Sequence, residues 1–266
     1  MVFTTDGLVI RETAVGEHDK ILTLLTPQHG QLSVSAKGAK SIKSKFLSTA
    51  KLFTYGNFEI YKKGDYHYLR DASLIEPFFR LSDDILKMSL ASYICELAKD
   101  ITAEDVSSVD ILRMTLNSFY AISRDLAPLP IIKGVYEIRA AAHSGFMPDL
   151  HLCAVCSADK QEYPYLDITN GRLLCKKCRD RVENERMMRK KGEFDDLDYE
   201  NYKVIRITGS VLAALRYAIS APPERMFSFE LSDKHEISVF SNVTEQYVLY
   251  HLERGFYTLD FYKSLQ

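Results

Sequence analysis

The sequence predicts an α+β protein, with an N-terminal β-barrel followed by a helical region that a cysteine-rich module interrupts. Three observations support this prediction. Short runs of alternating apolar and polar residues fill the chain up to Pro77, and helical spacing of apolar residues replaces them beyond it. Two Cys-x-x-Cys pairs then separate the later helical segments, the first at Cys153 and Cys156 and the second at Cys175 and Cys178.

Five short strands are expected before the first helix. Leu32, Val34 and Ala36 recur at every second position, which is the spacing of a strand with one buried face. Turns that contain glycine are expected at residues 27–30 and 62–65. The strands are expected near residues 7–10, 21–25, 32–36, 58–61 and 66–69. This number of short strands predicts a five-stranded barrel of the oligonucleotide-binding (OB) type.

The rest of the chain is predominantly helical in pattern. Residues 82–84 supply a cap and acidic groups for a first helix, and Pro222 ends a later one because proline cannot continue a helix. Helices are expected near residues 85–97, 109–119, 131–144 and 208–220. Residues 227–240 are expected to be a strand pair or an irregular segment. Asn242 and Glu245 resemble a capping box that opens a last helix, which continues through residues 250–252.

These elements predict four segments along the chain. They are an OB-fold nucleic-acid-binding domain at residues 1–79, the first part of a helical domain at 80–150, a zinc-binding module at 151–181 and the second part of the helical domain at 182–266. The zinc-ribbon-like module is therefore expected to be an insertion in the helical domain.

The two cysteine pairs predict one structural zinc ion. Eighteen residues separate Cys156 from Cys175, and an Asn170-Gly171 turn between them is typical of a hairpin that brings both pairs together. Four thiolates fill a tetrahedral zinc shell and leave no position open for substrate. Two alternatives are redox or buried cysteine pairs and an iron–sulfur cluster. The lone Cys95 lies on an apolar helical face and is expected in the core.

Charge is unevenly distributed, although the formal net charge is only −2. Residues 31–63 contain seven basic residues and one acid, and four of the basic residues are expected on a mobile loop that contacts phosphates: Lys37, Lys40, Lys43 and Lys45. The same pattern suits an ordinary solvated loop. Phe53 or Tyr61 is expected to stack on bases, although Phe46 and Phe53 also suit a buried core. A second basic stretch, residues 176–191, is expected to be a solvated face and is the next candidate for DNA contact.

Other patterns exclude several function classes. No apolar run approaches the length of about 18 residues that a membrane span needs, and no secretory signal opens the sequence, so we expect a cytoplasmic protein without membrane contacts. Motifs of P-loop ATPases, zinc proteases, serine hydrolases and zinc deaminases do not occur. The histidines are scattered. We therefore expect no catalytic residues and no enzymatic activity.

Several motifs resemble the RecO family of bacterial recombination mediators, over nearly the whole length of the chain. The similar segments are residues 5–11, 16–23, 26–30, 36–46, 136–156 and 252–259. The most specific of them runs from Tyr136-Glu137-Ile138-Arg139 through Gly145-Phe146-Met147-Pro148-Asp149-Leu150 to Cys153-Ala154-Val155-Cys156. Ser157 stands where the family usually has glycine, and Tyr257-Thr258 stands where it commonly has a basic residue and serine.

The resemblance implies binding of single- and double-stranded DNA, annealing of complementary strands and loading of the RecA recombinase onto DNA coated by single-stranded DNA-binding protein. It also implies a nucleoid-associated location and two partners, RecR and the C-terminal tail of the single-stranded DNA-binding protein. From the residues alone, a zinc-ribbon module that binds RNA remains an alternative, which competition between DNA and RNA would test. A nucleic-acid enzyme is a further alternative, which turnover assays would test.

Overall fold

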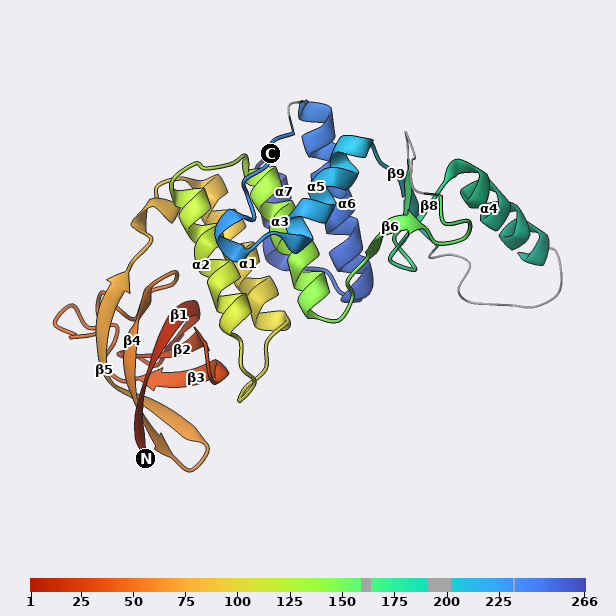
Figure 1. Ribbon diagram of the computed structural model, residues 1–266. Coiled ribbons are helices and arrows are strands. Elements are labelled where there is room, and N and C mark those ends of the chain that lie inside the picture. Colours follow the sequence, from red (N-terminus) through yellow and green to blue (C-terminus); the bar gives the residue numbers. More distant parts are fainter. Residues whose placement is uncertain (159–163, 191–201, 232) are drawn as a thin grey trace. The chain divides into compact units, whose positions relative to one another are not determined.

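The computed structural model describes residues 1–158, 164–190, 202–231 and 233–266, apart from the side chains of residues 188–190. The chain forms two compact units, Met1–Leu129 with Phe256–Gln266 and Pro130–Gly255. The first unit contains a β-barrel and helices, and the second contains helices and a small sheet (Figure 1). Among the described residues, no helix has the length and apolar character needed to cross a membrane.

A closed barrel of five strands forms the N-terminal part of the first unit. The strands are β1 (Val2–Val15), β2 (Asp19–Thr26), β3 (Gly30–Ala36), β4 (Tyr55–Lys63) and β5 (Tyr66–Glu76), in the order β1-β2-β3-β5-β4. Neighbouring strands are antiparallel except β3 and β5, which pair in parallel and close the barrel. The predicted five-stranded OB-type barrel is confirmed. The strands extend beyond the predicted apolar runs because backbone pairing continues where the side chains face solvent.

Alternating side chains fill the inside of this barrel. Leu22 and Leu24 on β2, Val34 on β3, and Phe58 and Ile60 on β4 are all fully buried. Side chains between them on the same strands point outward, as the period of two requires. Burial of one such apolar side chain contributes about 1.5–3 kcal/mol, so the core can hold the barrel together without a metal.

The turn between β2 and β3 is pressed against the segment that follows the first helix. Gly30 has a φ of 61°, and a Cβ at this position would lie 2.0 Å from the carbonyl oxygen of Ala103. Gln31 N donates to the same carbonyl at 3.3 Å, and Asp105 N donates to His29 O at 2.9 Å. Only glycine combines this backbone conformation with this close approach.

Three α-helices and a short 3-10 helix complete the described part of the first unit. They are η1 (Phe79–Leu81), α1 (Ile85–Asp100), α2 (Val109–Ser123) and α7 (Tyr257–Ser264). Asp84 caps α1 by accepting hydrogen bonds from the backbone N–H of Leu86 and Lys87, which confirms the predicted start. On α7, Thr258 N donates to Glu96 of α1 at 3.1 Å, and the rings of Phe256 and Tyr93 lie 5.6 Å apart. The segment from Phe256 therefore belongs to the first unit.

The main helices of the second unit are α3 (Leu129–His143), α5 (Gly209–Ser220) and α6 (Lys234–His251), with a short 3-10 helix, η3 (Pro223–Arg225). α3 starts at the unit boundary. The predicted start of the last long helix at Asn242 is wrong. Asp233 caps α6 by accepting from His235 N, so residues 234–240 are helical and not a strand pair. Polar residues in the first turn of α6 concealed this start in the sequence.

A buried charge network joins α3 to α6. Lys133 Nζ lies 3.0 Å from a carboxylate oxygen of Glu137 and 2.9 Å from one of Glu245, and Thr244 donates to Glu137 at 2.8 Å. Burial raises the pKa of Glu137, and the neighbouring Lys133 acts in the opposite direction. At Gly134 a Cβ would meet the ring of Phe240 at 2.6 Å, so the two helices pack closely.

A four-stranded sheet carries the cysteine module. Its strands are β6 (Asp149–Cys153), β7 (Tyr165–Asp167), β8 (Arg172–Leu174) and β9 (Val204–Arg206), in the order β6-β8-β7-β9. α4 (Lys176–Lys190) follows β8 directly. The predicted hairpin is confirmed by the antiparallel pairing of β7 with β8. The sequence interpretation missed β9, which is three residues long and pairs with β7.

Candidate metal centre and nucleic-acid interface

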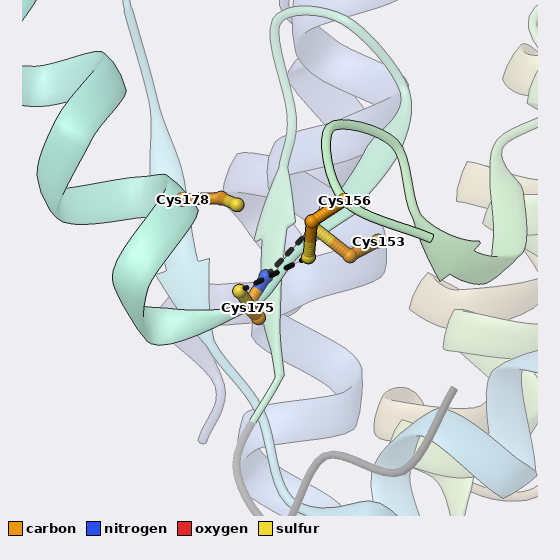
Figure 2. Close-up of side chains that lie close together, drawn as sticks. All are labelled: Cys153, Cys156, Cys175 and Cys178. Carbon is orange, nitrogen blue, oxygen red and sulfur yellow. Dashed lines mark hydrogen bonds between the residues drawn. The ribbon is translucent and has the colours of Figure 1, made fainter. Parts of the chain in front are cut away.

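The four predicted metal ligands lie together in the second unit. Cys153 ends β6, Cys156 lies in the following turn, Cys175 follows β8 and Cys178 lies in the first turn of α4. Figure 2 shows that the side chains from both pairs point toward one another, and all four sulfur atoms lie within 4.8 Å of one another. A tetrahedron with zinc–sulfur bonds of about 2.3 Å has edges of about 3.8 Å. Cys156 Sγ and Cys175 Sγ are 3.8 Å apart, so the cluster can hold a metal ion.

Backbone hydrogen bonds hold the two turns beside each other. Ala154 N donates to Leu173 O at 2.9 Å, which ties the first turn to β8, and Cys175 N donates to Cys153 Sγ at 3.3 Å. Ser157 N donates to Cys153 O at 2.8 Å and closes the first turn. Ser157 has a φ of 57°, a conformation that favours glycine. This backbone conformation gives a physical reason for the glycine that the RecO family usually has here.

The surroundings of the sulfur atoms favour a bound cation. Burial acts to raise the pKa of the Cys153 thiol, but N–H donors from Cys175, Val155 and Cys156 lower it to about 6. Burial and the neighbouring sulfur atoms raise the pKa of Cys178 to about 12. A second thiolate beside the first is unfavourable without a positive charge between them. A divalent cation at the centre of the cluster would stabilise all four thiolates.

Asp167 on β7 organises the hairpin between the cysteine pairs. Its buried carboxylate accepts hydrogen bonds from Asn170 N at 3.2 Å, from Asn170 Nδ2 at 2.9 Å and from Arg172 Nε at 3.1 Å. Gly171 follows with a φ of 60°, and a Cβ there would lie 2.6 Å from the hydroxyl of Tyr247. The expected Asn170-Gly171 turn is confirmed, and the carboxylate that holds it was not assigned a role from sequence.

Two helical side chains fasten the sheet within the second unit. Arg216 of α5 donates to Leu150 O at 2.7 Å and to His151 O at 2.8 Å. The ring of His251, at the end of α6, lies 2.9 Å from Ile168 O. Burial lowers the pKa of His251. Neither contact has a sequence signal, because each joins residues more than 60 positions apart.

The predicted nucleic-acid-binding lysines lie between β3 and β4. Lys37, Lys40, Lys43 and Lys45 are all exposed. The loop is a series of hydrogen-bonded turns, and Ala39, Phe46 and Ala50 anchor it in the barrel core. Gly38 N donates to Asp19 at 2.7 Å, and Lys40 N donates to His18 O at 3.0 Å, which fixes the loop against the β1–β2 turn. The structure thus shows an anchored loop where a mobile one was expected.

The sequence interpretation that no acid neutralises these lysines is wrong for one of them. Lys45 Nζ lies 3.1 Å from a carboxylate oxygen of Asp71 on β5 and donates to Arg70 O at 2.7 Å. The hydrogen bond from Lys45 lowers the pKa of Asp71. Lys40 Nζ donates to Gly16 O at 3.0 Å and keeps its full charge. Lys37 lies over the ring of Tyr68, 5.8 Å from its centroid.

Two of the other candidates for DNA contact have different surroundings. Phe46 and Phe53 are buried, and Phe53 packs edge-on against Phe119, so both are core residues and cannot stack on bases. The second basic stretch forms most of α4, where Arg179 and Arg181 pair with acids on the same helix. Its residue 191 and the side chains of residues 189 and 190 lie outside the described part of the chain.

Comparisons with known families decide the relationship. The family described as "Recombination protein O N terminal" matches residues 1–78, and the family described as "Recombination protein O C terminal" matches residues 82–192. The chain belongs to the RecO family. The first RecO match covers the barrel, and the second extends from α1 to α4 and includes all four cysteines.

Proteins named "DNA repair protein RecO" are similar over nearly the whole chain. The relative from Acetivibrio thermocellus is 29% identical over 262 residues, which are 98% of this chain and 96% of the relative. The relative from Caldanaerobacter subterraneus is 28% identical over 261 residues, 98% of this chain and 97% of the relative. A Listeria monocytogenes relative is 30% identical over 173 residues, 65% and 67% of the two chains. This protein is thus a member of a family of DNA repair proteins.

Proposed function

We propose that this RecO-family protein is a non-enzymatic recombination mediator. It binds single- and double-stranded DNA, anneals complementary strands and helps load RecA onto DNA coated by single-stranded DNA-binding protein. The observation that carries the proposal is the similarity to proteins named DNA repair protein RecO over 98% of the chain. A closed five-stranded barrel with exposed lysines beside it is compatible with contacts to phosphates, which carry no base information and let strands change register.

Strand annealing is the direct test. Complementary oligonucleotides coated with single-stranded DNA-binding protein should anneal faster when the protein is added, with no nucleotide consumed and no phosphodiester bond cleaved. RecR should change this rate if it is a partner, and RecA should assemble sooner on the coated strand. No acceleration of annealing would contradict the proposal. Equal or better competition by RNA would favour an RNA-binding module instead.

We further infer that the cysteine cluster binds one structural zinc ion. Cys153, Cys156, Cys175 and Cys178 would hold it, and four protein ligands leave no position for water or substrate. Zinc would therefore stabilise the short strands around it and take no part in chemistry. Elemental analysis of the purified protein should give one zinc per chain, and bound iron would instead indicate an iron–sulfur site.

The C-terminal tail of single-stranded DNA-binding protein is proposed as a ligand of the helical region. An acidic tail with apolar residues suits an apolar groove that has basic residues at its edge. The isolated tail peptide should bind the whole protein at low salt, and binding should weaken as salt is added. A titration without binding at low salt would exclude this partner.

A further inference from the structure

The hairpin of β4 and β5 presents three tyrosine rings on its outer side. We name them the tyrosine strip: Tyr61, Tyr66 and Tyr68. Tyr61 pairs directly with Tyr68, and Lys63 pairs with Tyr66. The alternate residues of the same strands, such as Ile60 and His67, are buried. The strip therefore lies on the solvent side of the barrel wall.

These rings are unusually open for residues of a sheet. Tyr66 is 71% exposed and Tyr61 is 41% exposed. The rings of Tyr61 and Tyr68 lie side by side across the two strands, with centroids 6.5 Å apart and planes inclined by 36°. Side-chain packing in the core does not require them, since the inner faces of both strands are filled by other residues. Flat apolar surface is thus available to a ligand.

Positive charge accompanies the strip. Lys37 Nζ lies 5.8 Å from the centroid of Tyr68, and Lys63 stands opposite Tyr66. Neither lysine forms an ion pair within the described part of the chain. Nearby acids are largely compensated, because Glu59 pairs with Arg70 at 3.2 Å and Asp71 pairs with Lys45 at 3.1 Å. Asp65, in the hairpin turn, is the remaining exposed acid there.

We propose that the tyrosine strip stacks on unpaired bases of single-stranded DNA while Lys37 and Lys63 contact the adjoining phosphates. The inference rests on the proposed DNA binding and assigns to these residues the preference for single strands. Rings and cations side by side match a ligand that alternates flat bases with negative phosphates. A proline-rich peptide would use the rings but leave the lysines without a partner charge. In duplex DNA the bases are already stacked on each other, so the strip gains little there.

Removal of the rings tests the proposal. The variant Tyr61→Val/Tyr68→Val keeps residues that favour strands, and Tyr61→Phe/Tyr68→Phe is the matched control that keeps the rings. Affinity of the Val variant for a thymidine oligonucleotide should fall at least about tenfold, which is about 1.4 kcal/mol, and the Phe control should bind like the natural protein. Duplex affinity should stay unchanged. An oligonucleotide without bases should bind both variants equally, with the same salt dependence.

A fluorescent probe gives a second, direct measurement. The chain contains no tryptophan, so Tyr68→Trp would introduce a single one into the strip. Its fluorescence should be quenched by a thymidine oligonucleotide and not by one without bases. Tyr257→Trp, on an 82% exposed position of α7, is the control and should not respond. Melting curves and circular dichroism would verify that each variant is folded.

Several outcomes would overturn the tyrosine strip as a base-stacking site. One is unchanged single-strand affinity in the folded Val variant. Another is an equal loss on single strands, duplex and oligonucleotide without bases, which would indicate a general defect. If the natural protein binds no DNA at all, the proposed function fails as well. If the lysine variant loses single-strand binding and the tyrosine variant does not, only the strip proposal fails.

Discussion

The barrel and the cysteine sheet are both small β-structures, yet they are stabilised in different ways. Barrel strands are 7 to 14 residues long, and they close on an apolar core. In the cysteine sheet, β7, β8 and β9 have only three residues each, and four cysteines converge at its end. The comparison teaches that the barrel depends on side-chain burial and the sheet on its ligand contacts. The two should therefore respond to different perturbations.

The largest effect is expected from Cys175→Ser. Loss of one thiolate leaves three ligands, and binding of structural zinc is worth about 10–16 kcal/mol in small zinc-finger peptides. We expect loss of the metal by elemental analysis, and fast hydrogen exchange in β7 and β8 while the barrel strands stay protected. Cys95→Ser is the control, because Cys95 is buried in α1 away from the cluster. Retained metal in Cys175→Ser would contradict the assignment.

Removal of the loop lysines should affect DNA binding and leave the metal in place. In the quadruple Lys→Ala variant at Lys37, Lys40, Lys43 and Lys45, single-strand affinity should lose a salt slope of roughly 0.7 per phosphate contact, up to about 3 units in all. This corresponds to up to about 4 kcal/mol at 0.1 M salt. Annealing should be poor, and zinc content and melting temperature should stay near those of the natural protein.

The matched control for that variant removes the same number of charges from α4. Lys176, Lys177, Arg181 and Arg186 would be changed to Ala, and affinity should change little if α4 is a solvated face. An unchanged salt slope in the loop variant, together with a reduced slope in the α4 variant, would move the DNA site to α4. Titrations at several salt concentrations distinguish the two outcomes.

Gly30→Ala should destabilise the first unit without affecting the metal. Its φ is 61°, and the new Cβ would lie 2.0 Å from Ala103 O, so backbone must shift. We expect a loss of about 3 kcal/mol in the free energy of unfolding, measured with denaturant. Gly16→Ala is the control, because its φ is 57° but no atom lies within 4 Å of the new Cβ. A loss of only about 1 kcal/mol is expected there. Equal effects in the two variants would mean that the approach to Ala103 is unimportant.

Acid should release the metal before it unfolds the barrel. Zinc binds the thiolate, and the pKa of Cys153 is lowered from 9.0 to about 6, so the charged form is favoured in the folded protein. The stabilisation is present above the ordinary pKa and is lost as the pH falls through the folded pKa. Zinc release to a colorimetric chelator should therefore rise below about pH 6, while barrel circular dichroism stays unchanged. Release that does not depend on pH between 5 and 8 would contradict this account.

Ser157→Gly should have the smallest effect, and it should be stabilising. Serine holds a φ of 57° in the first cysteine turn, and glycine adopts this conformation without the steric cost. We expect about 0.5–1 kcal/mol of added stability and slower transfer of the metal to a chelator. Ser157→Ala keeps the Cβ and serves as the control. Faster transfer in Ser157→Gly than in Ser157→Ala would disprove strain at this turn.

Sequence periodicity predicted the barrel because its strands have one buried face, and residue spacing predicted the cysteine cluster because both pairs are local motifs. The start of α6 was wrong because Asn242 and Glu245 imitate a cap, while the true cap, Asp233, precedes a polar first turn. Contacts across long sequence separations left no local signal. The ion pair of Lys45 with Asp71 is one example, and the hydrogen bonds of Arg216 to β6 are another.

The packing of α7 on α1 has a consequence for the order of synthesis. Phe256 contacts Tyr93, and Thr258 donates to Glu96, yet all of Pro130–Gly255 is translated between these partners. A nascent chain therefore leaves the ribosome with the α1 surface uncovered while the entire second unit is made. That surface includes apolar groups that a chaperone could hold. Chains cut before α7 would keep it exposed, and proteolytic quality control could recognise them as unfinished.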